Sequence, residues 1–415
     1  MRHASFPAER TSRPLRVLLL LGNWVGGGAE RVAVHLLNAL PAHWDVRLGL
    51  LHAGTAWLDQ VDPSRVLLAP GAARHFRYDR PNAELFNPAT LVSGALHGPR
   101  AFRHMIRETR ADVVVSFLKG TAILTWLALT GLANRPRWIA REGNNVFATA
   151  QEESPNAMVR RASLALTGMA YRRADAVLTN ARDMARDLTA GLRLDPAQVH
   201  TIHNPVDIAA VEAAASRPVA APPPRPYVLS AGRLETQKGH EVLLAAWAAG
   251  TARRSHDLVI IGEGSRAAAL KALARALGVA DSVRFVGFAA NPHVWMARAD
   301  LFVMPSRWEG FPNAAAEAMA AGTPLLLADC DYGPRELVVP GCSGTLVPVD
   351  DAPALTAALD GLLASPALRA AHAAAGRFRV RQFAIDRIVE RYATLISSVA
   401  EATESRLAPL RIAPA

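Results

Sequence analysis

The chain has 415 residues, of which 51 % are hydrophobic and 20 % are charged, and this balance excludes a disordered or low-complexity protein. Its length predicts two or three domains, at roughly 100–200 residues per domain. The formal net charge is +10. Two cysteines, Cys330 and Cys342, are too few for a disulfide framework, and no apolar run approaches the roughly 18–20 residues of a membrane span. We therefore expect a soluble, cytoplasmic protein of several domains.

In the first half, short apolar runs alternate with helical stretches such as 29–40 and 121–132. This alternation is typical of buried parallel strands joined by crossover helices. It predicts a doubly wound, Rossmann-like domain over residues 1–204. The strands are expected at Arg16–Leu21, Val46–Leu51, Val66–Ala69, Asp112–Phe117, Arg137–Arg141, Ala176–Asn180 and Val199–His203.

Residues 205–226 contain the run Ala221–Pro224, which neither a helix nor a central strand tolerates, and they are predicted to be a proline-rich linker. The strand and helix pattern then restarts and predicts a second Rossmann-like domain over 227–380. Residues 381–415 are expected to form a helix that crosses back to the first domain, followed by a tail. The second set of strands is expected at Tyr227–Ala231, Leu258–Gly262, Val283–Phe288, Leu301–Pro305 and Pro324–Ala328.

A glycine-rich loop follows the first predicted strand, with Gly26, Gly27 and Gly28 before Ala29-Glu30-Arg31. Glycines at this point let backbone N–H groups approach an anion, while the next helix directs its positive end toward it. The spacing is not Gly-x-Gly-x-x-Gly, so the loop lacks a dinucleotide fingerprint. A substrate loop and a merely tight strand-to-helix turn both remain open.

The first strand of the second half is followed by a loop that carries Gly232-Arg233 and Lys238-Gly239. A guanidinium and an ammonium five residues apart can clamp a diphosphate, one as a bidentate fork and the other as a point charge. Lys238 is one of only three lysines against 43 arginines in the chain. The alternative is a solvated turn, and the flanking glycines favour anion binding.

A later loop places two carboxylates eight residues apart, Glu309 and Glu317, and Asn313 between them is predicted to cap a helix. Carboxylates accept hydrogen bonds from sugar and ribose hydroxyls, and a helix N-terminus suits phosphate. The alternative is that both are ordinary surface glutamates. This alternative explains Glu309 poorly, because Glu309 lies among Trp, Gly, Phe and Pro, but it remains a fair explanation of Glu317.

These motifs, in this order, resemble the retaining nucleotide-sugar glycosyltransferases of the GT-B fold, family 4. The resemblance covers nearly the whole chain and is strongest from Tyr227 to Pro348. It implies two Rossmann-like domains that face each other across a cleft. It also implies that Arg233 and Lys238 neutralise the donor diphosphate, Glu309 holds the donor sugar and Glu317 holds the ribose. The further implied donor contacts are Gly232, Gly262, Gly310, Phe311, Pro312, Asn313 and Ala314.

The acceptor side is less defined. The resemblance places Gly26–Gly28 along the cleft, and it places Lys119 where many relatives have a histidine near the donor sugar. Either Lys119 makes a polar contact to the donor sugar in place of that histidine, or this contact is absent. The identity of the donor hexose is therefore not predicted. Glu142 and Asn144 are candidate acceptor contacts. The segment Asp329–Leu337 resembles the corresponding segment of those family members that extend lipid-linked or envelope oligosaccharides, often from UDP-sugars.

We expect no cofactor and no metal, because basic side chains and a helix dipole neutralise the diphosphate in such a fold. Asp329 and Asp331 are therefore not predicted to bind a metal, and His203 is predicted to pack or to act at the hinge. The expected reaction moves a hexose or N-acetylhexosamine to a hydroxyl acceptor with retention of configuration. The alternatives are a GT-B sugar epimerase or phosphorylase, or an inactive nucleotide-sugar-binding protein.

The positive charge is concentrated in residues 1–200, which hold 25 Lys and Arg against 16 Asp and Glu. This excess indicates an anionic ligand or surface, and nucleic acid is not expected because no nucleic-acid-binding motif is present. Residues 102–110 and 158–173 mix arginines with apolar residues at helical spacing. They predict either half-buried helices or a basic amphipathic surface on the inner face of an anionic membrane.

Overall fold

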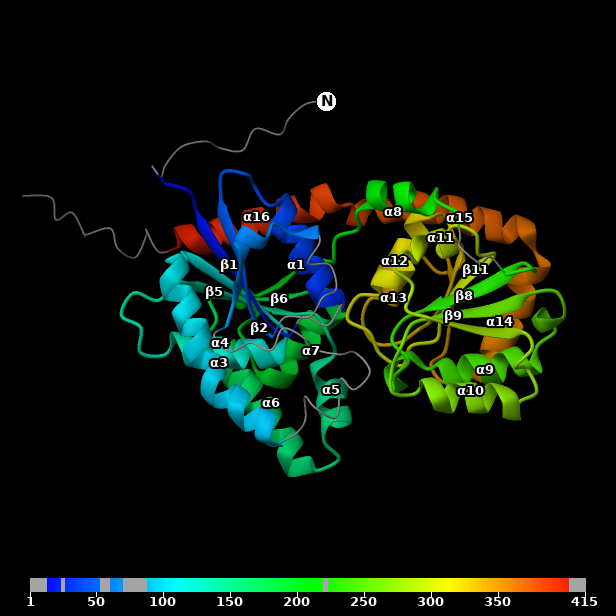
Figure 1. The fold of residues 1–415 in the computed structure, drawn as a ribbon, viewed down its shortest axis with the longest axis horizontal. Helices are drawn as coiled ribbons and strands as arrows, with labels where there is room; N and C mark the ends of the chain where they lie inside the picture. The colour runs from blue at the N-terminus through cyan, green and yellow to red at the C-terminus, as the bar shows by residue number, and fades with distance from the viewer. Residues whose placement is uncertain (1–12, 24–26, 53–59, 70–87, 219–222, 403–415) are drawn as a thin grey trace, which may run out of the picture.

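Two parallel β-sheets, each covered by helices on both faces, form the two halves of the molecule (Figure 1). The computed structural model describes residues 13–23, 27–52, 60–69, 88–218 and 223–402. Gly26, part of the proline run 221–224 and the tail beyond residue 402 lie outside these ranges.

The N-terminal sheet has the strand order β3-β2-β1-β4-β5-β6-β7, and every pairing in it is parallel. Its strands are β1 (Arg16–Asn23), β2 (Asp45–His52), β3 (Val66–Leu68), β4 (Val113–Phe117), β5 (Arg137–Glu142), β6 (Ala176–Thr179) and β7 (Val199–Thr201). Its helices are α1 (Gly28–Ala39), α3 (Pro88–Thr109), α4 (Lys119–Leu129), α5 (Val146–Glu153), α6 (Ala157–Tyr171) and α7 (Arg182–Leu192).

The C-terminal sheet has the corresponding order β10-β9-β8-β11-β12-β13, again all parallel. Its strands are β8 (Tyr227–Ala231), β9 (Asp257–Ile261), β10 (Val283–Gly287), β11 (Leu301–Met304), β12 (Leu325–Ala328) and β13 (Thr345–Val347). Its helices are α8 (Ile208–Ala215), α9 (His240–Ala249), α10 (Ala267–Ala276), α11 (His293–Met296), α12 (Asn313–Ala320), α13 (Pro334–Leu337), α14 (Ala352–Ala364) and α15 (Pro366–Val380), and α16 (Ile385–Glu401) follows them.

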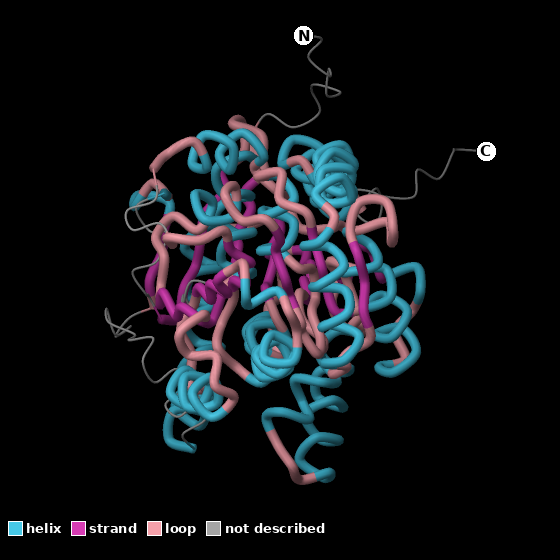
Figure 2. The backbone as a smooth tube through the Cα atoms, turned by 90° about the vertical axis from the view of Figure 1, so that its right-hand side faces the viewer, coloured by secondary structure: helices cyan, strands magenta, loops and turns pink. Residues whose placement is uncertain are grey.

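The central strands are mostly apolar because both of their faces are buried. In β1, Leu18, Leu19 and Leu20 are all fully buried. Leu18 and Leu20 join the core on one face of the sheet, and Leu19 joins the core on the other. Alternate residues of one strand therefore build two separate cores, and Figure 2 shows the strands enclosed by helices on both sides.

The chain crosses twice between the domains, at Val206 and at Ala384. The two crossings lie side by side, because the N–H of Val206 donates to the carbonyl of Phe383 at 2.8 Å and that of Ile385 donates to the carbonyl of Val206 at 3.0 Å. Beyond the second crossing, α16 runs along the N-terminal domain (Figure 1) and places Tyr392 in its core.

The structure differs from the sequence prediction in the linker. Residues 208–215, predicted to be part of that linker, form α8, whose Val211 is buried in the core of the C-terminal domain. Asp207 caps this helix by accepting from the N–H of Ala210, and the alanine-rich sequence that follows is a strong helix former. Within the described residues, no helix is long and apolar enough to cross a membrane.

Candidate active site

The two domains meet through the loops that carry the predicted motifs. A Cβ atom on Gly310, which follows β11, would lie 1.9 Å from the carbonyl oxygen of Gly143, which follows β5. A Cβ atom on Gly28, at the start of α1, would lie 2.5 Å from Nδ2 of Asn313, at the start of α12. The Gly310 contact is with a backbone atom, so only glycine fits there, whereas a larger residue at Gly28 would have to displace the Asn313 side chain. The two domains therefore approach closely where the donor and acceptor loops were predicted to face each other.

Lys238 and Glu309 form an ion pair of 2.5 Å in the C-terminal domain. Lys238 ends a 3₁₀ turn, η4 (Thr236–Lys238), and Gly239 after it has φ +62°. A side chain on Gly239 would meet the carbonyl oxygen of Pro305, so this glycine lets the η4 turn pack against the end of β11. The pair is well shielded, since Lys238 is 17 % and Glu309 is 6 % exposed. The structure thus brings together two side chains that the sequence assigned to one donor site.

Arg233 lies on the same loop as Lys238, and its side chain is exposed. Its guanidinium donates to Oε1 of Gln237 at 3.1 Å, and Gln237 in turn donates to the carbonyl of Trp308 at 2.9 Å. Burial raises the pKa of Glu152 on α5 of the other domain, and the positive charge of Arg233 opposes that rise. Arg233 is therefore an exposed cation whose charge acts on a residue of the other domain.

Glu317 of α12 is held from both domains. One carboxylate oxygen accepts from the guanidinium of Arg31 on α1, and the other lies 3.1 Å from Nε2 of His293 on α11. Burial alone would raise the pKa of this carboxyl, but Arg31 and His293 together lower it to about 2. The carboxylate is consequently ionised and shared between the domains. Arg31 belongs to the glycine-rich motif but was not predicted as a site residue.

This arrangement predicts a loss of stability in acid. The pKa of Glu317 falls from 4.5 to about 2 on folding, so the carboxylate stabilises the fold above pH 4.5 and loses this contribution as the pH falls toward 2, by up to about 3 kcal/mol. Glu317→Gln should therefore show a smaller loss of unfolding free energy than the unmodified chain in urea titrations between pH 6 and pH 3. Glu390→Gln, at an exposed position of α16, is the control. If the unfolding free energies of the Glu317→Gln chain and the unmodified chain depend on pH in the same way, the lowered pKa of Glu317 is contradicted.

A polar network runs beneath the contact between the domains. Asn204 donates to Oδ1 of Asn313 at 2.8 Å and accepts from the guanidinium of Arg141 at 2.5 Å. Arg141 also donates to the hydroxyl of Tyr392 on α16 at 2.8 Å. Asn313 was predicted to be the helix N-cap, but the structure makes Pro312 the cap and Asn313 the first helical residue. Its amide instead joins α12 to the N-terminal domain.

A second contact between the domains involves His203 and Glu336. Nε2 of His203 lies 2.6 Å from the Glu336 carboxylate, whose other oxygen accepts from the N–H of Arg182 at 2.6 Å. The His203 ring also packs against Phe311 and Phe383, which contact each other. His203 is thus a packing residue at the contact between the domains, as predicted.

The three polar residues predicted on the acceptor side are engaged within their own domain. Lys119 pairs with Glu153 of α5. Glu142 is 1 % exposed and accepts from the Tyr171 hydroxyl at 2.6 Å and from the N–H groups of Gly143 and Asn144 at 2.8 and 3.0 Å. Glu142 therefore shapes the loop that reaches Gly310, and in this structure its carboxylate does not face an acceptor.

The remaining predicted glycines have packing roles. A Cβ atom on Gly262, at φ +138°, would lie 1.9 Å from the carbonyl oxygen of Gly232, so these two loops cross at contact distance. Gly232 itself packs against the side chain of Lys238. These glycines position the lysine. Ala314 lies in the first turn of α12, at the positive end of that helix.

The described residues contain no group of His, Cys, Asp and Glu side chains that could hold a metal ion. Asp329, the first residue of the Asp-x-Asp sequence, pairs instead with Arg335.

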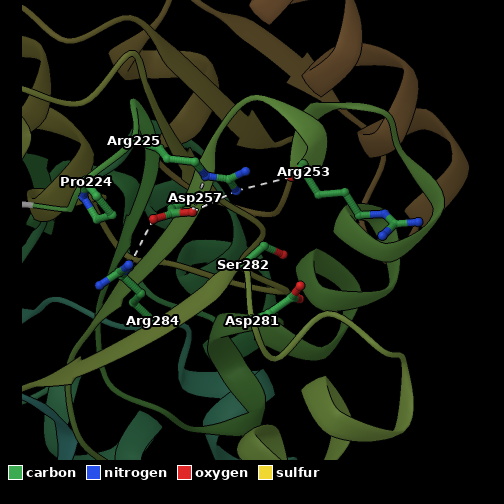
Figure 3. Close-up of a pocket in the computed structure, with 7 residues that line it drawn as sticks. All are labelled: Pro224, Arg225, Arg253, Asp257, Asp281, Ser282 and Arg284. Carbon is green, nitrogen blue, oxygen red and sulfur yellow. Dashed lines mark hydrogen bonds and ion pairs between the residues drawn. The ribbon is translucent and has the colours of Figure 1, made fainter.

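A pocket of about 290 Å³ lies at the amino ends of β9 and β10, at the edge of the sheet opposite to the motifs (Figure 3). Its buried Asp257 accepts from Arg225 at 2.8 Å and from Arg284 at 2.9 Å. Since these charges satisfy one another, we assign the pocket no part in the reaction. It is lined by Pro224, Arg225, Arg253, Asp257, Asp281, Ser282 and Arg284.

Comparison with known families covers both domains. Residues 26–210 match the model of glycosyltransferase family 4, and residues 212–379 match the model of glycosyl transferases group 1. The chain is a family 4 glycosyltransferase. The two matches also agree with the fold, since the first covers β2 to β7 of the N-terminal sheet and the second covers the whole C-terminal sheet, and this GT-B architecture is the one predicted from the sequence.

Two relatives of this glycosyltransferase are named for lipid-linked or lipopolysaccharide sugars. It is 26 % identical over 86 % of its length to the N-acetylgalactosamine-N,N'-diacetylbacillosaminyl-diphospho-undecaprenol 4-alpha-N-acetylgalactosaminyltransferase of Campylobacter jejuni, of which 92 % is covered. It is also 26 % identical over 90 % of its length to the lipopolysaccharide core biosynthesis glycosyltransferase LpsE of Rhizobium meliloti, of which 96 % is covered.

Among solved structures, Anabaena HepE in complex with UDP and glucose superposes with a TM-score of 0.72. The two chains are 19 % identical, and the match covers 92 % of this glycosyltransferase and all of HepE. At this identity the likeness concerns the fold.

Proposed function

We propose that this glycosyltransferase moves a hexose or N-acetylhexosamine from a nucleotide-diphosphate sugar, with UDP favoured, to a hydroxyl of a lipid-linked or envelope saccharide. The observation that carries the proposal is the ion pair between Glu309 and Lys238, whose loop also carries Arg233, together with Glu317 of α12, which pairs with Arg31 in the glycine-rich motif of the other domain. The lipid-linked acceptor is supported by the names of the relatives.

The chemistry follows from where charge develops. Cleavage of the bond between sugar C1 and the diphosphate leaves an oxocarbenium-like sugar and a leaving group that gains negative charge. Lys238, Arg233 and the N-terminus of α12 would stabilise that charge, so the reaction as proposed needs no metal. Glu309 would orient the sugar hydroxyls, and Glu317 would bind the ribose once the donor competes with Arg31.

We also propose that the anomeric configuration is retained. A double displacement would need a carboxylate nucleophile on the opposite face of the sugar. Glu142 is the carboxylate of the loop that meets Gly310, and it is buried with both oxygens hydrogen-bonded. We therefore favour a front-face displacement, in which a leaving-group oxygen helps to deprotonate the acceptor hydroxyl. NMR spectroscopy of the product would test this, because an inverted anomer contradicts it.

The choice of donor can be tested by thermal unfolding in the presence of UDP, GDP or ADP. A ligand at 100 times its dissociation constant stabilises the folded state by about 2.7 kcal/mol, so UDP should raise the Tm of the chain by several degrees and more than the other two. Arg233→Ala should lose most of this shift, and the exposed Arg275→Ala on α10 should keep it. A larger shift with GDP or ADP would overturn the choice of UDP.

The same proposal places the reaction in the cytoplasm, at the inner face of the cytoplasmic membrane. A lipid-linked acceptor would require the domain gap to lie within reach of a membrane surface.

A further inference from the structure

Helix α6 exposes an apolar face. In the described part of the chain, twelve large hydrophobic side chains are exposed, and four of them lie on this one helix. Met158 is 78 % exposed, Val159 53 %, Met169 48 % and Leu166 40 %. The opposite side of the helix is buried, with Tyr171 fully so. The helix is thus anchored by its inner face and presents an outer face that water does not favour.

Helical spacing gathers these side chains. Met158, Ala162, Ala165 and Met169 recur every three or four residues and are all exposed, with Leu166 beside them. The α5–α6 hairpin reaches the lower edge of the molecule in Figure 1, and the perpendicular view of Figure 2 shows the same projection. The face is therefore convex and protruding, and it is not a groove.

Positive charge surrounds this face. Arg161 is exposed on α6 and Arg172 and Arg173 are exposed directly after its end, and no Asp or Glu lies between Ser154 and Ala174. The acids nearest to these ends do not neutralise the arginines, because Glu153 pairs with Lys119 and Asp175 pairs with Arg137. An apolar helix face bordered by cations and free of acids is complementary to the boundary between anionic headgroups and acyl chains.

We propose that the outer face of α6 docks this protein onto an anionic lipid surface. A convex methionine-rich helix needs no matching groove in a fluid bilayer, whereas a protein partner would have to supply one. A second copy of the chain is disfavoured because its arginines would meet these arginines. The inference deepens the proposed function, because it assigns a surface to the membrane location proposed above, although docking itself requires neither donor nor acceptor.

The position of α6 links this surface to the site. Residues 154–156 alone join it to α5, and α5 begins directly after the loop that carries Gly143 and Asn144. That loop meets the C-terminal domain, since a Cβ atom on Gly310 would lie 1.9 Å from the carbonyl oxygen of Gly143. A membrane beneath α6 would therefore lie near the gap between the domains, where a lipid-linked acceptor could enter.

The test is co-sedimentation of the full chain with phosphatidylcholine vesicles, with and without about 30 % phosphatidylglycerol. The chain should bind the anionic vesicles and not the neutral ones. The double variant Arg161→Gln/Arg173→Gln should bind about tenfold to thirtyfold more weakly, at about fivefold for each arginine. Met158→Ser/Met169→Ser should lose at least tenfold in affinity. These side chains are exposed, so an unchanged Tm is expected to show that the variants fold.

The matched controls lie on the other domain. Arg253→Gln/Arg275→Gln removes two exposed arginines there, and Phe378→Ser removes a side chain that is 72 % exposed on α15, so both should bind as the unmodified chain does. Equal binding to neutral and anionic vesicles, or no effect of either α6 variant, would overturn the proposal. So would conversion of a dimer to a monomer by the α6 variants, which would assign the face to a second copy. Nucleotide release with a soluble acceptor, measured on the same variants, reports on the proposed function separately.

Discussion

Replacing Lys238 by alanine is expected to lower kcat by about a hundredfold to a thousandfold, the loss that follows removal of one preorganised group that stabilises developing negative charge. The ammonium is held on η4, whose position is fixed by Gly239 against the end of β11. It would therefore meet the leaving diphosphate without reorganising. Nucleotide release under saturating donor measures the effect. Lys271→Ala, on α10, is the matched control and should turn over normally.

The ion pair with Glu309 requires a second measurement. Removal of Lys238 also leaves a 6 % exposed carboxylate without its partner, at a cost of about 3–5 kcal/mol in stability. A double-mutant cycle with Glu309→Gln separates this effect from catalysis. If Lys238 acts on the donor, the double variant should be slower than Glu309→Gln alone by a further large factor. Equal rates in the two would show that Lys238 serves only to neutralise Glu309.

Most strands of the two sheets could be predicted from the sequence because they are short, mostly apolar runs. β4 and β11 are buried at every position, and such runs leave a clear signal. β13 was not predicted, although it is no shorter than β3 and β7, which were. α8 was missed because a proline run downstream was taken to mark the whole segment as a linker, although Val211 had a core to enter.

The candidate site was predictable only within each domain. Lys238 and Glu309 were placed in one donor site from their motifs, and the structure joins them in an ion pair. The partners supplied by the other domain were not found. Arg31 and Glu317 are 286 residues apart in the sequence, and their contact depends on how two independently folded sheets dock. Neither hydrophobic periodicity nor local spacing carries that information.

The contact between Gly310 and Gly143 allows the docking of the two domains to be tested by a single substitution. Gly310→Ala would place a Cβ atom 1.9 Å from the carbonyl oxygen of Gly143 and 2.6 Å from its carbon. Both are backbone atoms of the other domain, so no side chain can move aside and the domains must separate. A misplacement of about 1 Å at a reacting centre costs on the order of a hundredfold in rate. The transfer rate should therefore fall by about that factor.

For Gly310→Ala we expect a fall in kcat with little change in donor affinity. The donor residues lie within the C-terminal domain, and the new methyl group strains only the approach of the C-terminal domain to the N-terminal domain. Equilibrium binding of UDP, followed by calorimetry, should match that of the unmodified chain. Gly361→Ala on α14, where a Cβ atom meets nothing within 4 Å, is the control and should keep full activity. Transfer at the normal rate by Gly310→Ala would show that this close approach is not part of the reactive state. If UDP affinity falls by as much as the transfer rate, the substitution has disturbed the donor loop itself. An effect on the approach of the domains alone would leave UDP binding to the C-terminal domain unchanged.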